Sequence, residues 1–245
     1  MKETDRSEPK NENLESDEDT RNVYLAFCDI LGFSAMVLSD FENTLSLYRD
    51  FGNTLAGADY LNDVEITMYS DSVLITGQDL YRVASAVQIL SFIALSQNFM
   101  IRGAITYGKY WEKKTERSLM VASDALIRAV NLESSIGIPA VAIADDIEIN
   151  DLVWARFFAD GPFSTPIFHY RDRNIVNPFN HFWFASAGNR AQQLLEEHPR
   201  HKDKYLWFLA LHTAVASGKN LTPDGKLEQL VAEGILAPIN TSAEE

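Results

Sequence analysis

The chain has one cysteine, Cys28, in 245 residues, so it cannot form an intrachain disulfide. It has no apolar run long enough to cross a bilayer, since the best candidate, residues 205–216, is too short. Basic residues are scarce, with 21 Lys and Arg against 35 Asp and Glu. Because a nucleic-acid-binding surface needs cations to neutralise phosphates, nucleic acid is not the expected partner. These absences predict a cytoplasmic protein without a membrane span.

Several common nucleotide-binding and catalytic motifs are also missing. The sequence contains neither G-x-x-x-x-G-K-[ST] nor G-x-G-x-x-G. Its five histidines show no zinc-type spacing with Cys28, and no Ser or Cys nucleophile motif is visible. Phosphate or metal chemistry must therefore depend on other residues.

Composition divides the chain into an acidic tail and a globular part. Residues 1–20 hold almost no apolar side chains, so burial cannot compensate for the entropy of ordering them. We expect this segment to be disordered, and it has no apolar core typical of a signal peptide. The rest is 21–145, the predicted core, and 146–245, an extension expected to pack on the same domain.

Hydrophobic patterning predicts alternating strands and helices in the core. The expected elements are a strand at 23–30, a helix at 34–58, a hairpin at 64–77, a helix at 80–97, a strand at 101–111, a helix at 123–135 and a strand at 140–145. This order begins as a ferredoxin-like α/β fold with a mostly antiparallel sheet flanked by helices. In the extension, helices are expected at 185–198, 204–217 and 226–233, and the aromatic cluster Trp154, Phe157, Phe158 and Phe163 is expected in the core.

Two carboxylates are predicted to meet at one edge of this sheet. Asp29 ends the first strand, and Asp71 lies at the polar tip of the hairpin. Because crossovers are right-handed, the first strand should lie antiparallel beside the third, which makes the two residues neighbours. Adjacent carboxylates repel unless one is protonated or a cation lies between them, and their hard oxygens suit Mg²⁺ or Mn²⁺. The pair therefore predicts a divalent-metal site.

The turn after Asp29 is a candidate phosphate site. Gly32 would let a triphosphate approach the backbone, with the N–H groups of Gly32 and Phe33 as donors. Taken singly, Asp-x-x-Gly after a strand and Asp in a hairpin tip are ordinary turn features. The coincidence of both at one place favours the metal and phosphate interpretation.

Four segments, in order, resemble motifs of class III nucleotidyl cyclases. "FCDILGFS" resembles their first metal-binding strand, and "YSDSVLIT" their second metal-binding hairpin, with Ser70 in place of the usual Gly. "RGAITYG" is similar to their next strand, and "SDALIRAVNLESS" to the helix that carries transition-state residues. Within the family, "SDSV", "IRGAITYG", the pattern A-L-x-x-A-x-x-L-E and "NPF" (177–179) most resemble the bacterial pyrimidine cyclases of Pycsar anti-phage defence.

This resemblance implies a class III cyclase catalytic domain that forms a homodimer with its active sites at the interface. Asp29, Asp71 and the carbonyl of Ile30 would hold two divalent cations, Mg²⁺ or Mn²⁺. A nucleoside triphosphate would be converted to a 3′,5′-cyclic nucleotide and pyrophosphate, through in-line attack of the ribose 3′-hydroxyl on the α-phosphate.

The transition-state positions depart from the family pattern. The family's Asn and Arg fall on Ile127 and Asn131. The remaining candidates for charge stabilisation are Arg128, Asn131 and Arg102, with Arg171 and Arg173 as a third option.

Each of these arginines also has a structural alternative. Arg128 could form an ion pair with Asp124 one turn earlier. Arg102 could equally lie at the core edge or in solvent, and the last two arginines in a solvated turn.

The base-recognition positions have changed as well. Thr67 and Met120 stand where adenylate cyclases carry Lys and Asp. A polar Thr and an apolar Met suit a smaller base, or simply a different pocket; the resemblance favours UTP converted to cUMP, with CTP next. Met120 could alternatively be core. Two other functions stay open: an adenylate or guanylate cyclase with a rearranged pocket, and a catalytically inactive nucleotide sensor. The changes at Ile127 and Asn131 favour the inactive sensor, whereas the retained pair Asp29 and Asp71 opposes it.

Overall fold

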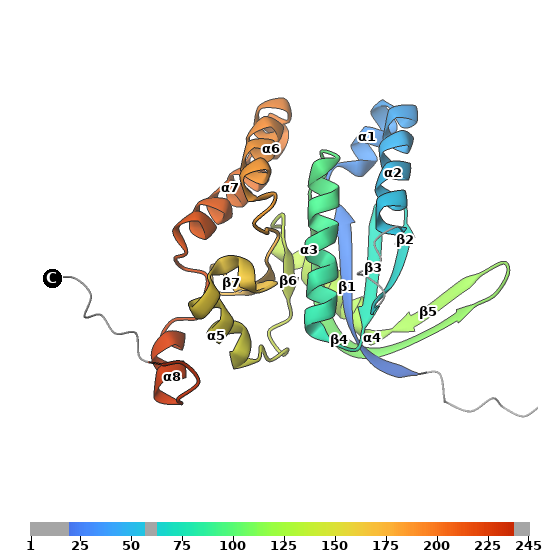
Figure 1. Ribbon diagram of the computed structural model, residues 1–245. Coiled ribbons are helices and arrows are strands. Elements are labelled where there is room, and N and C mark those ends of the chain that lie inside the picture. The colour runs from blue at the N-terminus through green and yellow to red at the C-terminus, as the bar shows by residue number, and fades with distance from the viewer. Residues whose placement is uncertain (1–19, 57–62, 238–245) are drawn as a thin grey trace, which may run out of the picture.

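The computed structural model describes residues 20–56 and 63–237, which form a mixed, mostly antiparallel sheet flanked by helices (Figure 1). In this part of the chain the sheet has eight strands in the order β2-β3-β1-β4-β6-β8-β7, with β5 paired to β4. The predicted α/β class is confirmed. Residues 1–19 of the predicted acidic tail lie outside the described residues.

The elements follow the predicted order. The strands are β1 (Arg21–Ile30), β2 (Glu65–Tyr69), β3 (Ser72–Gly77), β4 (Ile101–Lys114), β5 (Leu119–Ser123), β6 (Val141–Ile143), β7 (Ile167–His169) and β8 (Asn174–Val176). The helices are α1 (Phe33–Ser39), α2 (Phe41–Ala56), α3 (Leu80–Ser96), α4 (Asp124–Ile136), α5 (Asp151–Asp160), α6 (Phe184–Glu197), α7 (Lys202–Ser217) and α8 (Lys226–Ala232).

Two local predictions need correction. The single helix expected at 34–58 is broken at Asp40, where the backbone leaves the helical conformation, with φ at −153°; residues 57 and 58 lie outside the described residues. Asp40 Oδ1 accepts a hydrogen bond from the backbone N–H of Asn43, so this side chain caps the start of α2 and favours the break. Helix α5 was not predicted, although its N-cap Asn150 accepts from Leu152 N. Of the aromatic cluster expected in the core, Trp154 and Phe157 are buried, and Phe158 and Phe163 are half-buried and pack against the core.

The two faces of β1 pack against different helices. Cys28 and Ile30 belong to the cluster formed with α3, which crosses in front of the sheet in Figure 1. Leu25 packs with Ala125 and Ala129 of α4 on the opposite face. Because side chains alternate along a strand, Asp29 points to the same face as Leu25, toward α4. The fold therefore places the candidate carboxylate beneath α4.

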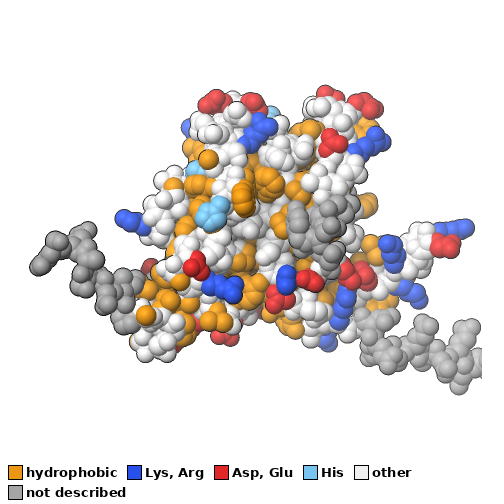
Figure 2. Space-filling view, viewed as in Figure 1, with side chains coloured by type: hydrophobic (Ala, Val, Ile, Leu, Met, Phe, Trp, Pro, Cys, Tyr) orange, Lys and Arg blue, Asp and Glu red, His pale blue; other side chains and the backbone are white. Residues whose placement is uncertain are grey.

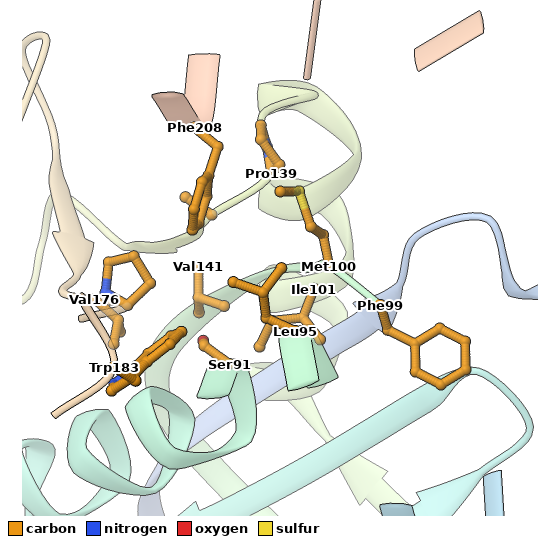
Figure 3. A pocket seen from close by; sticks show the side chains of 12 residues that line it. Ser91, Leu95, Phe99, Met100, Ile101, Pro139, Val141, Val176, Trp183 and Phe208 are labelled. Atoms are coloured by element: carbon orange, nitrogen blue, oxygen red, sulfur yellow. The ribbon is translucent and has the colours of Figure 1, made fainter. Parts of the chain in front are cut away.

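Residues beyond 145 continue the same sheet. Strand β8 pairs with β6, and Gln88 of α3 donates through Nε2 to the carbonyl oxygens of Asn177 and Phe179. Trp183 and Phe208 line a small apolar pocket with residues of α3 and the central strands (Figure 3). This pocket contains none of the predicted site residues. The division at residue 145 stays a prediction.

The surface carries charged side chains of both signs, and Figure 2 shows hydrophobic side chains between the two upper helical projections, α6 with α7 and α1 with α2. None of the helices in the described ranges has both the length and the apolar character to cross a membrane.

Candidate functional site

The structure brings Asp29 and Asp71 together. Strands β1 and β3 are antiparallel, with Asp29 opposite Ser72, and the N–H of Ile30 donates to the carbonyl oxygen of Asp71 at 2.8 Å. The predicted adjacency is confirmed. The carboxylate of Asp71 accepts from Ser34 Oγ at 3.3 Å. The backbone at Ser70 has φ of +55°, a left-handed conformation that favours glycine.

Arg102 lies directly against Asp29. The two residues face each other across β1 and β4, and Arg102 Nε donates to Asp29 Oδ2 at 2.9 Å. The same nitrogen lies 2.7 Å from Glu133 Oε1. Of the predicted cations, Arg102 is therefore the one that the fold places at the carboxylate pair, rather than at a core edge or in solvent.

Sequence reasoning missed two further charged residues near Asp29. Glu133 lies on α4 and is 6% exposed. Lys204, at the start of α7, is close enough to lower the pKa of the Asp29 carboxyl. A signal existed for Glu133, because Ala125, Ala129 and Glu133 follow at four-residue spacing along the buried side of the helix, where a charge is unusual. Lys204 offered no such signal.

The electrostatics of Asp29 show incomplete compensation of its negative charge. Burial raises the pKa of this carboxyl most strongly, and the charge of Asp71 raises it further. The hydrogen bond and charge of Arg102 lower the pKa, as does Lys204, yet the net pKa remains above its ordinary value. Burial and Arg102 lower the pKa of Lys204, against the opposite influence of Asp29 and Glu133. An added cation beside Asp29 would therefore be favourable.

The donor set fits a metal that arrives with phosphate ligands. Within residues 20–56 and 63–237, no group of three or more His, Cys, Asp and Glu side chains has a metal-binding arrangement. Mg²⁺, however, commonly takes one or two carboxylates and completes its shell with substrate phosphates and water. Asp29, Asp71 and the carbonyl of Ile30 can supply such a set, provided that Arg102 releases Asp29.

The turn after β1 has the backbone that its sequence predicts. Gly32 has φ of +81° and precedes α1, a conformation that favours glycine. The Phe33 side chain is buried and packs against Tyr48 and Phe99, so only its backbone N–H could meet a phosphate. The phosphate-binding role of both residues stays a prediction.

Arg128 does not take its expected partner. It donates through Nη1 to the carbonyl of Tyr107 at 3.0 Å and forms an ion pair with Asp146 rather than with Asp124. Asp124 packs over Gly108, where an added Cβ would lie 2.5 Å from its Oδ1, so this carboxylate is turned toward β4. The expected ion pair between Arg128 and Asp124 is therefore wrong.

The remaining candidate residues of α4, and the candidates Arg171 and Arg173, lie toward the surface. Asn131 is exposed, and Ile127 is 64% exposed on the same helix. Arg171 and Arg173 lie in and beside the turn between β7 and β8, as the turn alternative expected. Any contact of Asn131 with a nucleotide stays a prediction.

The two predicted base-recognition residues lie apart in one chain. Thr67 on β2 is opposite Leu74, whereas Met120 on β5 is opposite Lys113, and β3, β1 and β4 lie between those strands. Met120 is 45% exposed on the β4–β5 hairpin that projects from the sheet (Figure 1), so it is not core. Their shared role in a base pocket stays a prediction.

The N-cap residue of α4, Ser123, links the start of this helix to β4, and its contribution to stability can be tested. Ser123 Oγ accepts from Leu126 N at 3.1 Å and donates to the carbonyl of Lys109 at 2.8 Å. Ser123→Ala should lower the free energy of unfolding by about 1 kcal/mol, measured by urea denaturation. The control Ser135→Ala, which removes only an exposed bond to Leu132, should stay within about 0.5 kcal/mol of wild type. Equal effects of both substitutions would contradict the capping role.

Comparison with known proteins finds similar architectures among nucleotidyl cyclases. No protein-family model and no curated protein matches the chain. The guanylyl cyclase Cya2 is 12% identical with a TM-score of 0.42, covering 54% of this chain and 83% of that one. The adenylyl cyclase CyaB from P. aeruginosa is 13% identical with a TM-score of 0.44, covering 66% and 96%.

A class III adenylyl cyclase-like ATP-binding protein from Pseudomonas aeruginosa is 12% identical with a TM-score of 0.44, covering 70% of this chain and 40% of that one. At these identities and TM-scores, the similarities concern architecture and carry no argument about activity or substrate.

Proposed function

We propose that the protein is a divalent-metal-dependent nucleotidyl cyclase. The observation that carries the proposal is the adjacency of Asp29 and Asp71, joined through the hydrogen bond from Ile30 N to Asp71 O. A partly buried carboxylate beside a second one is stabilised by a cation, and burial and Asp71 raise the pKa of Asp29 against the influence of Arg102. The four cyclase-like motifs in their family order support the same activity.

In this proposal the chain's own residues hold and orient the reactants. Asp29, Asp71 and the Ile30 carbonyl provide oxygen ligands, and the N–H groups of Gly32 and Phe33 face the triphosphate. Bound divalent cations would acidify the ribose 3′-hydroxyl and neutralise the departing pyrophosphate. Arg102 lies beside this site and adds a positive charge near it.

We propose UTP as the substrate and cUMP as the product, formed in anti-phage defence. Thr67 and Met120 lack the charges that the family uses for adenine, and CTP is the next candidate. Met120 and Ile127 are exposed on the β4–β5 hairpin and α4, which is compatible with a second subunit completing the base pocket. We therefore place the proposed active sites at a homodimer interface.

A catalytically inactive nucleotide sensor is the second candidate. The ion pair of Arg102 with Asp29 favours it, because this arginine holds an oxygen that a metal would need. Ile127 and Asn131 at the family's transition-state positions favour it as well. An adenylate or guanylate cyclase with a rearranged pocket is the nearest alternative among active enzymes.

One assay separates these functions. Purified protein is incubated with Mn²⁺ and each of the four NTPs separately, and pyrophosphate and cyclic nucleotide are measured, with EDTA as control. Turnover of UTP alone supports the proposal, whereas turnover of ATP or GTP alone supports a purine cyclase. Binding of nucleotides without any product would support the sensor and contradict cyclase activity.

A further inference from the structure

One guanidinium nitrogen of Arg102 lies within reach of two carboxylates beside Asp71. Arg102 Nε lies 2.9 Å from Asp29 Oδ2 and 2.7 Å from Glu133 Oε1. An Nε carries a single hydrogen, and here that hydrogen is directed at Asp29. Oε1 of Glu133 is consequently close to a cation but accepts no hydrogen bond from any of the described residues.

Glu133 is buried in a way that makes this arrangement unfavourable. The residue is 6% exposed on the inner side of α4, and its hydrogen bond from Ser134 Oγ, at 3.2 Å, goes to the other oxygen, Oε2. A buried carboxylate oxygen without a hydrogen-bond donor loses its hydration, and the nearby charge of Arg102 replaces only part of that loss. Arg102 has four further N–H groups on its guanidinium, so a small rotation could pair it with Glu133 through two parallel hydrogen bonds.

We propose that Arg102 exchanges between these two carboxylates. Without metal it neutralises Asp29; when a divalent cation binds Asp29 and Asp71, Arg102 moves fully onto Glu133. Glu133 is then a positioning residue that sets the divalent-cation affinity of the site, because it accepts the arginine that the metal displaces. This inference rests on the metal site of the proposed function.

The test measures Mn²⁺ binding to the full chain, without nucleotide, by electron paramagnetic resonance of free Mn²⁺. Glu133→Gln keeps the size and removes the charge, so Arg102 stays on Asp29, and the Kd for Mn²⁺ should rise about tenfold or more. In an Arg102→Gln background there is no arginine to accept, and the same substitution should change Kd by less than about twofold.

An equal loss in both backgrounds would overturn the exchange, since it would show that Glu133 acts only through its negative charge. An unchanged Kd in the single variant would overturn it too. Glu133→Met, also uncharged and of similar length, replaces the Gln variant if that variant does not fold.

A second measurement uses the unmodified chain. In ¹⁵N NMR, the Nε–H resonance that Arg102→Gln removes should shift when Mg²⁺ is added, and a resonance that stays in place overturns the proposal. If Mn²⁺ binds with the predicted dependence on Glu133 but no NTP is cyclised, the exchange stands and the proposed function fails. If the wild type binds no Mn²⁺, both fail.

Discussion

Asp71→Asn is expected to lower Mn²⁺-dependent cyclisation of the preferred NTP by at least about a hundredfold, because it removes a direct metal ligand rather than an outer partner. The amide oxygen of Asn can still accept from Ser34, so the fold should be unaffected. We expect the melting temperature of the metal-free protein to stay within about 2 °C of wild type. The rate is measured from pyrophosphate release, and the melting temperature by calorimetry.

Asp172→Asn provides the matched control. Asp172 is an exposed residue of the turn between β7 and β8, with φ of +64°, a conformation that Asn tolerates. The substitution changes the net charge by the same amount and should leave turnover at the wild-type rate. A fully active Asp71→Asn protein would remove Asp71 from the proposed site, and a loss in both variants would show an effect of net charge.

Gly103→Ala is expected to destabilise the protein by about 3 kcal/mol or more. Gly103 lies opposite Cys28 between β1 and β4, and an added Cβ would lie 2.2 Å from the carbonyl oxygen of Phe27. Because that contact is with backbone, only separation of the two central strands can relieve it. The same separation would disturb the pairing of Arg102 with Asp29, so turnover should fall as well. Urea denaturation gives the free energy of unfolding.

Gly52→Ala is the opposite case and serves as its control. Gly52 lies within α2, and an added Cβ there would meet no atom within 4 Å. Alanine lowers the conformational entropy of the unfolded chain and favours the helix, so stability should rise by about 0.5–1 kcal/mol. If Gly103→Ala instead stayed within about 1 kcal/mol of wild type, the close approach of β1 and β4 would be wrong.

The sequence predicts the position of the carboxylate pair because two simple rules combine. Alternating and apolar runs mark the strands, and the handedness of crossovers places the first strand beside the third. This strand order alone makes Asp29 and Asp71 neighbours, because it does not depend on how the side chains pack. The break at Asp40 is a local capping effect that helical periodicity does not report, and α5 was missed although Asn150 offered an N-cap signal.

The charged surroundings of Asp29 could not be predicted in the same way. The contact between Arg102 and Asp29 depends on the register of β1 against β4, and Glu133 joins them only through the rotation of α4 about its axis. Lys204 lies on α7, and the position of this helix depends on the packing of Tyr205 and Phe208 against residues far away in the sequence. Arg128 likewise turned to Asp146 in a loop, a partner that helical spacing does not indicate. Such contacts are set by tertiary packing, which local pattern does not encode.

The most direct test is a crystal structure of the full chain with Mn²⁺ and a non-cyclisable UTP analogue, using anomalous scattering to locate the metal. We predict a peak about 2.0–2.5 Å from oxygens of both Asp29 and Asp71, with the triphosphate completing the shell. A metal bound elsewhere, or nucleotide bound with Arg102 still on Asp29 and no metal between the two carboxylates, would contradict the metal-dependent cyclase.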